Sequence, residues 1–159
     1  MEKIEQKYTN RSVTHPVTQD PGITDQHGRS FNYLRIAVNE KCNLRCIYCM
    51  PEKGISFEPQ DKLLTRKEVI RVIQVVAKLG VNKIRFTGGE PLLRKDLVEL
   101  VSGAAETPGI DSINLTTNGI LLANSAKSLK DGGLTGVNVS IDTLEKEKYT
   151  EITRRDYID

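Results

Sequence analysis

Long apolar runs are absent from this sequence. No segment approaches the roughly 20 apolar residues that a membrane-spanning helix needs. The first residues, "MEKIEQKYTNRSVTHPVTQD", also lack the apolar region of a secretory signal. They carry Glu2 and Glu5, whereas organelle transit peptides are poor in acidic residues. We therefore expect a cytoplasmic protein.

An excess of one charge is absent as well. Lys and Arg together number 23, Asp and Glu number 21, and the formal net charge is +2. No block of basic residues stands out along the chain. Proteins that bind nucleic acid or membrane surfaces typically concentrate positive charge. The sequence therefore predicts neither nucleic acid nor membrane as a partner.

Cysteine is scarce, and the whole supply lies in one place. Cys42, Cys46 and Cys49 are the three cysteines of the chain, in the stretch "KCNLRCIYCMP". In the cytoplasm thiols stay reduced, so clustered cysteines are more typical of metal ligands than of disulfides. The sequence therefore favours a metal centre in this stretch.

The number of cysteines bears on the kind of metal centre. A structural zinc site normally takes four protein ligands, and the only two histidines, His15 and His27, lie near the N-terminus. An iron–sulfur cubane also takes four ligands when it serves electron transfer. Held by three cysteines, it keeps one iron open, which can chelate a substrate and pass it an electron. Structural zinc, a disulfide and chance clustering remain as alternatives.

The rest of the chain divides into a polar start and a regular pattern. Residues 1–28 contain Pro and Gly without hydrophobic periodicity, which predicts a flexible or loosely docked arm. From residue 29 to 159, β-rich runs alternate with amphipathic stretches. The expected strands are residues 33–38, 82–87, 112–117 and 136–141, and the expected helices are residues 65–80, 94–106, 122–133 and 144–152.

Strands that alternate with helices in this way predict repeated βαβ units and a parallel sheet, and therefore an α/β fold. In such sheets ligands bind beyond the carboxyl ends of the strands. The unusual loops all follow strands: the cysteine loop, "TGGEP", "TTNG" and "SIDT". We therefore expect these loops to converge on one edge of the sheet.

The segment "TGGEP" has two interpretations. It is either a glycine turn that leads into a helix, with Pro91 near the first turn, or part of a binding site. In the second case Gly88 and Gly89 let the backbone approach a ligand, and Glu90 accepts a hydrogen bond from an ammonium group.

Other polar residues near the strand ends also have more than one interpretation. Asn118 with Gly119 is a strong turn signal and could form only a turn. This pair, and Ser140 with Asp142, could also bind a ligand or cap the helices that follow, and these two roles do not exclude each other.

Two strands carry arginines among apolar residues. Arg35 and Arg85 are costly within strands unless they are paired. Facing a cavity they suit a phosphate-bearing substrate, and surface ion pairs are the alternative.

The spacing C-x3-C-x2-C resembles that of the radical S-adenosylmethionine (SAM) enzymes. That resemblance implies a TIM-like βα barrel, here partial with about four parallel strands. It also implies a [4Fe–4S] cluster on the three cysteines, whose open iron takes the amino and carboxylate groups of SAM. An electron from the cluster then yields a 5′-deoxyadenosyl radical. Tyr48 matches the aromatic residue of the motif and is expected near the adenine, and "TGGEP" matches the motif that contacts the SAM amine.

Longer segments resemble one branch of these enzymes, the GTP 3′,8-cyclase family of molybdenum cofactor biosynthesis. They are "GRSFNYLRIAVNEKCNLRCIYCMPEKG", "NKIRFTGGEPLLRKDL", "INLTTNGILLA", "GLTGVNVSIDTL" and "EITRRD". The resemblance implies a radical lyase that converts GTP to 3′,8-cyclo-7,8-dihydro-GTP. It implies SAM contacts at Tyr48, Gly88, Gly89, Glu90 and Ser140, and GTP contacts at Arg35, Arg85 and Thr116.

The sequence also departs from that family. Family members continue to six strands and a C-terminal region with a second cluster, whereas residues 29–159 match the N-terminal portion of the core domain. We therefore expect a fragment, a truncated gene product, or a subunit completed by another chain. The expected partners are GTP, an electron donor, a downstream pyranopterin-forming protein and, as an open alternative, a second copy of the chain.

Two alternative functions stay open. The chain is either a non-catalytic module that binds a cluster or SAM, or a different radical SAM enzyme such as a peptide-modifying maturase. Against the maturase stand Arg35, Arg85 and the Cys-Met-Pro sequence that ends the cysteine loop.

Overall fold

The structure is a computed structural model that describes residues 22–157. Its strands form one parallel sheet in the order β1-β2-β3-β4, which confirms the predicted α/β fold. Within the described residues, β1 and β4 each pair with one strand, so the sheet is open at both edges. The strands are β1 (Tyr33–Ala37), β2 (Lys83–Thr87), β3 (Ser112–Thr117) and β4 (Gly136–Val139).

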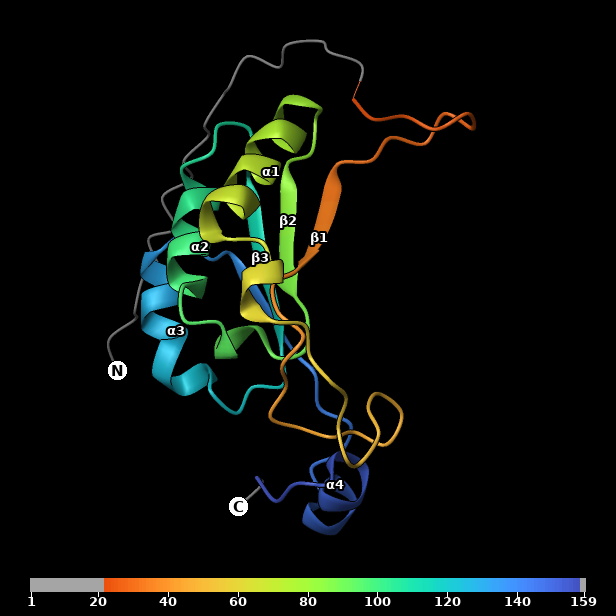
Figure 1. The fold of residues 1–159 in the computed structure, drawn as a ribbon. Coiled ribbons are helices and arrows are strands. Elements are labelled where there is room, and N and C mark those ends of the chain that lie inside the picture. The colour runs from red at the N-terminus through yellow and green to blue at the C-terminus, as the bar shows by residue number, and fades with distance from the viewer. Residues whose placement is uncertain (1–21, 158–159) are drawn as a thin grey trace, which may run out of the picture.

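The helices lie in two places. Helices α1, α2 and α3 cover one face of the sheet, whereas α4 lies beyond the carboxyl ends of the strands (Figure 1). Two short 3-10 helices, η1 and η2, precede α1 and α2. The bounds are η1 Gln60–Lys62, α1 Arg66–Lys78, η2 Pro91–Leu93, α2 Leu97–Ala105, α3 Leu122–Asp131 and α4 Lys146–Thr153. None of the described helices is both long and apolar enough to cross a bilayer.

The hydrophobic core lies between the sheet and α1–α3. Side chains alternate between the two faces of a strand, and β2 and β3 turn their apolar residues toward the helices. Its fully buried members are Ile73, Ile84, Phe86, Leu100, Val101, Ala104, Leu115 and Leu129. The alternation leaves Arg35, Arg85 and Thr116 on the opposite, open face.

Helix α1 begins as its sequence predicts. The Thr65 side chain accepts a hydrogen bond from the Glu68 amide, and the Glu68 carboxylate accepts one from the Thr65 amide, which is a complete capping box. Hydrogen bonds from Thr65 lower the pKa of Glu68. The apolar stripe is buried only in part. Val72 and Leu79 are exposed because α1 lies at the end of the helical layer, with α2 as its helical neighbour.

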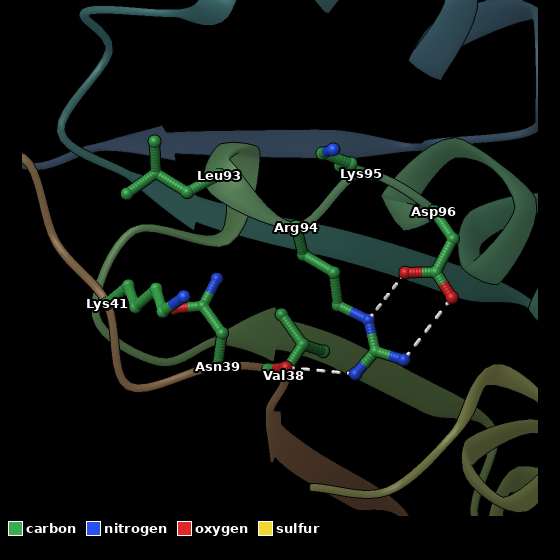
Figure 2. Close-up of a pocket in the computed structure, with 7 residues that line it drawn as sticks. All are labelled: Val38, Asn39, Lys41, Leu93, Arg94, Lys95 and Asp96. Atoms are coloured by element: carbon green, nitrogen blue, oxygen red, sulfur yellow. Dashed lines mark hydrogen bonds and ion pairs between the residues drawn. The ribbon is translucent and has the colours of Figure 1, made fainter. Parts of the chain in front are cut away.

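The second helix is shorter than the predicted residues 94–106. It begins at Leu97, because Arg94 has extended backbone after η2. The Arg94 guanidinium donates to the Val38 carbonyl oxygen and pairs with Asp96 at 2.8 Å (Figure 2). It also donates to the Leu64 carbonyl oxygen. This ion pair lowers the pKa of Asp96. Arg94 therefore fastens the end of β1 and the start of α1 to the start of α2.

Arg94 and Asp96 line a cavity of about 410 Å³. The Arg94 side chain is only 8% exposed, and Nε, Nη1 and Nη2 all donate to protein acceptors. Its role there is structural.

The last two elements also differ from prediction at their ends. Strand β4 ends at Val139 rather than at residue 141, and α4 begins at Lys146 rather than at residue 144. β4 is an edge strand here and pairs with β3 through Val139, so no second neighbour extends it.

The predicted N-terminal arm lies mostly outside the described residues, which begin at Gly22. From there the chain makes a turn, with a bridge between Thr24 and Ser30. The Ile23 amide donates to the Leu79 carbonyl at 3.2 Å, so this turn is docked at the end of α1. The division at residue 28 stays a prediction.

Candidate functional site

The loops that follow the strands converge, as the parallel topology predicts. They line a cavity of about 190 Å³ at the carboxyl edge of the sheet. Its walls include Cys42, Cys46, Tyr48, Cys49, Gly88, Gly89, Glu90, Thr116, Thr117, Asn118, Ser140, Asp142, Tyr149 and Thr153. Every residue that the sequence implicates in cluster or SAM binding therefore borders one cavity.

The cysteine loop has a compact local structure. The amides of Cys49 and Met50 both donate to the Cys46 carbonyl, at 2.9 and 3.0 Å, which closes one tight turn. Ahead of it, the Arg45 guanidinium donates to the carbonyls of Cys42 and Leu44, both at 2.7 Å. Arg45 therefore holds the first part of the loop in shape.

The thiols differ in exposure. Cys42 and Cys46 are partly buried and Cys49 is exposed. Burial raises the pKa of the Cys46 thiol, and the neighbouring thiols of Cys42 and Cys49 contribute to the increase.

Cys42, Cys46 and Cys49 line one cavity and offer three sulfur ligands. Among residues 22–157, no three Cys, His, Asp or Glu side chains lie close enough together to hold a single metal ion. A structural zinc ion needs four such ligands at about 2.0–2.3 Å. A [4Fe–4S] cluster instead takes each cysteine at a different iron atom, so its thiolates line a shared cavity without meeting at one point. The residues present fit the cluster.

The histidines do not complete a zinc site within the described residues. His27 belongs to the turn that precedes β1, at the amino edge of the sheet, whereas the cysteine loop lies at the carboxyl edge (Figure 1). His15 lies outside the described residues.

Gly88 and Gly89 are needed for the contact between two loops. A Cβ atom at Gly89 would lie 2.6 Å from the Glu40 carbonyl oxygen, and one at Gly88 would meet the Asn39 backbone. Gly88 also has a left-handed φ of 138°. The Gly89 amide donates to Asn39 at 3.0 Å, and the Glu90 amide to Lys41 at 2.7 Å. The glycines therefore seat the start of the cysteine loop on the end of β2.

Glu90 is the most deeply buried charged residue of the site, at 1% exposure. Its carboxylate accepts hydrogen bonds from the Leu92 amide at 2.9 Å and from Thr117 Oγ1 and the Asn118 amide at 2.8 Å. A carboxylate offers about four acceptor positions, and these donors occupy three of them. Glu90 thus joins the loop after β2 to the loop after β3.

The loops after β3 and β4 hold the cysteine loop rather than cap helices. Asn118 Nδ2 donates to Asn43 Oδ1 at 2.7 Å, and no side chain caps α3. Similarly, Asp142 accepts a hydrogen bond from the Tyr48 hydroxyl at 2.8 Å, and no side chain caps α4. The hydrogen bond to Asp142 raises the pKa of Tyr48. The capping interpretation of these residues is therefore wrong.

The two strand arginines face a second cavity, of about 340 Å³, on the open face of the sheet. Arg35 and Arg85 occupy matching positions on neighbouring strands. Arg85 Nη1 donates to Thr116 Oγ1 at 3.2 Å and to Asn138 Oδ1 at 2.6 Å. Within the described residues no salt bridge involves either arginine, so the predicted alternative of surface ion pairs is not observed.

Thr116 and Ser140 line both cavities, which are therefore adjacent. The arginine cavity also has walls that were not assigned from the sequence, at Tyr33, Asn138 and Val139. Strand alternation places Tyr33 on the same face as Arg35, and pairing places Asn138 beside Thr116. The period-two pattern was therefore the signal that could have found Tyr33 and Asn138.

The cysteine loop follows the first strand of the parallel sheet, and the Gly-Gly-Glu loop that packs against it follows the second. This combination is typical of one class of protein. The sequence profile of the radical SAM superfamily matches residues 36–159, and the chain belongs to this superfamily.

Within that class, the chain is similar to GTP 3′,8-cyclases. It is 54% identical over 132 residues to the GTP 3′,8-cyclase of Pelotomaculum thermopropionicum, covering 83% of this chain and 41% of the relative. It is 46% identical over 149 residues to molybdenum cofactor biosynthesis protein moc-5 of Caenorhabditis elegans, covering 94% of this chain and 25% of that protein. The chain thus spans between a quarter and about two fifths of the length of these relatives.

The fold is shared with solved structures as well. The structure of SuiB of Streptococcus suis bound to S-adenosylmethionine matches with a TM-score of 0.63 at 20% identity. The match covers 79% of this chain and 27% of that one. This likeness confirms the partial barrel.

Proposed function

We propose that this chain provides the SAM-cleaving part of a GTP 3′,8-cyclase in molybdenum cofactor biosynthesis. In this proposal Cys42, Cys46 and Cys49 hold one [4Fe–4S] cluster, and SAM occupies the cavity that these thiols line. A reduced cluster, when bound, supplies the electron that cleaves SAM to methionine and a 5′-deoxyadenosyl radical. GTP is the proposed substrate. An outside electron donor reduces the cluster, and the cyclised nucleotide passes to a pyranopterin-forming protein.

The observation that carries the proposal is the border between the two cavities. Thr116 and Ser140 line both the cysteine cavity and the arginine cavity. A radical formed in the first cavity therefore has a substrate pocket directly beside it. That proximity is what hydrogen abstraction requires, because reacting atoms must approach to about 3–3.5 Å.

For SAM, the chain offers groups of matching chemistry. The remaining acceptor position on Glu90 suits the methionyl ammonium group, and the Tyr48 ring, 70% exposed, offers a surface for the adenine. Ser140 supplies a hydroxyl on the same side. Gly88 and Gly89, already packed on Asn39 and Lys41, present their backbone to the cavity.

For GTP, the decisive feature is unbalanced positive charge. Arg35 and Arg85 occupy paired positions on adjacent strands, and within the described residues neither forms a salt bridge. Like charges directly opposite each other on neighbouring strands repel, and an anion between them relieves this repulsion. Thr116, held by the Arg85 guanidinium, extends the polar wall toward the cysteine cavity. A triphosphate satisfies this arrangement.

The first experiment tests cluster and SAM chemistry. The chain is reconstituted anaerobically with iron and sulfide, reduced with dithionite, and assayed for iron and 5′-deoxyadenosine. We expect about four iron atoms per chain and SAM cleavage, and we expect Cys46→Ala to lose both. A wild-type chain that binds no iron would contradict the proposal.

The second experiment tests the substrate. The reconstituted chain is mixed with GTP, with and without the separately produced C-terminal part of a cyclase relative, and the cyclised nucleotide is measured. We expect product only when both parts are present, and a loss of about a hundredfold in Arg85→Ala, since a charge-assisted contact to phosphate contributes about 1.5–3 kcal/mol. SAM cleavage without any GTP-dependent product would instead favour a different radical SAM enzyme.

A further inference from the structure

We propose that Arg154 is a positioning residue that latches the end of α4 onto the cysteine loop and so holds the three thiols in place. The link to cluster binding rests on the proposed function. The latch itself is a property of the metal-free chain. It joins residues more than 100 positions apart, since the contacts of Arg154 reach back by 104 and 109 residues.

Helix α4 stands apart from the main core. It lies beside the loop that follows β1, beyond the carboxyl ends of the strands, rather than on the face of the sheet (Figure 1). Its buried residues are Tyr149 and Thr153. Tyr149, like Leu44 of the cysteine loop, is buried without belonging to the core between the sheet and the helices. Both line the cysteine cavity. The helix and the loop therefore shield each other from water.

Backbone hydrogen bonds join the two segments. The Arg45 amide donates to the Thr153 carbonyl at 3.0 Å, and the Ile47 amide donates to the Ile152 carbonyl at 2.9 Å. These carbonyls belong to the last turn of α4, where they have no partner within the helix. The cysteine loop thus supplies the donors that the end of α4 lacks.

The Arg154 side chain adds hydrogen bonds to both ends of the turn that carries Cys46 and Cys49. Its Nη1 atom donates to the Met50 carbonyl at 3.2 Å and to the Arg45 carbonyl at 3.4 Å. Arg45 precedes Cys46, and Met50 follows Cys49. One guanidinium therefore bridges the two ends of the turn that carries these cysteines.

The backbone of Arg154 supports a specific role. With φ 54° and ψ 29°, it is the one non-glycine residue with left-handed backbone among residues 22–157. Glycine adopts this conformation readily, and a residue with a Cβ atom does so at a cost. An arginine at a position that suits glycine indicates that its side chain is used. The Thr153 hydroxyl helps to hold this turn by accepting from the Arg155 amide at 3.3 Å.

The test compares three substitutions of one residue in the metal-free chain. Arg154→Gly removes the guanidinium and relieves the backbone, Arg154→Ala removes the guanidinium and keeps the Cβ atom, and Arg154→Lys keeps the charge. The control is Arg71→Ala, an exposed arginine on α1. Hydrogen exchange is followed at the Arg45 and Ile47 amides, with the buried part of α2 as the internal reference.

We expect exchange at Arg45 and Ile47 to rise about tenfold in both Arg154→Gly and Arg154→Ala, because a charge-assisted hydrogen bond is lost. Exchange in α2 should stay unchanged in every variant, and Arg154→Lys should be intermediate. General unfolding would accelerate α2 as well. Unchanged exchange in Arg154→Gly, with or without a change in Arg154→Ala, would overturn the proposal.

A second measurement connects the latch to the metal centre. After anaerobic reconstitution, Arg154→Gly should retain less than half of the wild-type iron, while Arg71→Ala retains all of it. Equal iron in Arg154→Gly and wild type would overturn the positioning role. Failure of the wild type to bind iron would instead refute the proposed function, and the hydrogen exchange result would still decide whether the latch exists.

Discussion

Two regions of this molecule are held together by different forces. The sheet and helices α1–α3 enclose a continuous apolar core in which Phe86, Ile73 and Leu115 are completely buried. The cysteine loop and α4 bury few apolar side chains. Hydrogen bonds of Arg154 help to join them to each other, and the bond from Tyr48 to Asp142 joins the cysteine loop to the loop after β4.

That difference separates stability from site geometry. Burial is proportional to area and tolerant of small shifts, so the core supports the fold as a whole. Hydrogen bonds depend on distance and direction, so the loop region depends on individual groups. Substitutions in the core should unfold the protein, whereas substitutions in the loop region should disturb the site and leave most of the stability in place.

The largest effect is expected from Phe86→Ala. The ring is fully buried between the sheet and the helices, and its truncation leaves a cavity, so the free energy of unfolding should fall by about 3–5 kcal/mol. Urea denaturation followed by circular dichroism measures this change. Phe31→Ala is the matched control, because that ring is 47% exposed and its loss should cost little. Equal losses in the two variants would remove the distinction between the regions.

Gly89→Ala should have the next largest effect and acts on the boundary between the regions. The added Cβ atom would collide with the Glu40 and Lys41 carbonyls, so we expect a loss of about 1–3 kcal/mol together with displacement of the cysteine loop. Urea denaturation gives the first value, and proteolysis within the loop reports the second. Gly22→Ala is the control, since its Cβ atom would have no neighbour closer than 3.5 Å.

Glu90→Gln should have a comparable or smaller effect on stability, with a local signature. The amide keeps the shape of the side chain but turns an NH2 group toward donors that now bond to a carboxylate. We expect a loss of about 1–3 kcal/mol and faster hydrogen exchange at the Asn118 amide. The exposed Glu99→Gln on α2 is the control. Unchanged exchange at Asn118 would show that Glu90 does not hold the third loop.

The smallest expected effect is the pH dependence of the contribution that Asp96 makes to stability. Arg94 lowers the pKa of Asp96 below its ordinary value of 3.8 in the folded state. The contribution of Asp96 to stability is therefore present at neutral pH and is lost as the pH falls through the folded-state pKa. Asp96→Asn should be less stable than wild type by up to about 1 kcal/mol at pH 7, and the difference should shrink as the pH falls below the ordinary pKa of 3.8 and through the lower pKa of the folded state. A difference that does not change with pH would contradict the role of this ion pair.

Much of the framework could be predicted because its causes are local. The capping box of Thr65 and Glu68 lies within four consecutive residues, and the strand from Ser112 to Thr117 was predicted with its observed ends. The start of α2 could not be predicted in this way. Arg94 has extended backbone there, and its side chain donates to the carbonyls of Val38 and Leu64, which are 56 and 30 residues away.

In the site, too, the features that depend on contacts between distant residues could not be predicted. Parallel strands bring their following loops to one edge whatever the loops contain, so the shared cavity of the cysteines, Glu90 and Ser140 followed from topology. The packing of Gly88 and Gly89 on Asn39 and Lys41 did not follow from topology. From the sequence, these two glycines were interpreted only as a turn or as a place where the backbone approaches a ligand. Asp142 was likewise weighed as a helix cap, and its partner is Tyr48, 94 residues earlier.

Local patterns were enough to predict the α/β architecture, the order of strands and helices, and the membership of the radical SAM superfamily, because periodicity and motif spacing are properties of neighbouring residues. Two features became visible only in the folded chain: the cysteine and arginine cavities share Thr116 and Ser140, and Arg154 donates to the loop that carries Cys46 and Cys49. Contacts of this kind depend on where distant segments meet in space, and no local pattern encodes the distance between them.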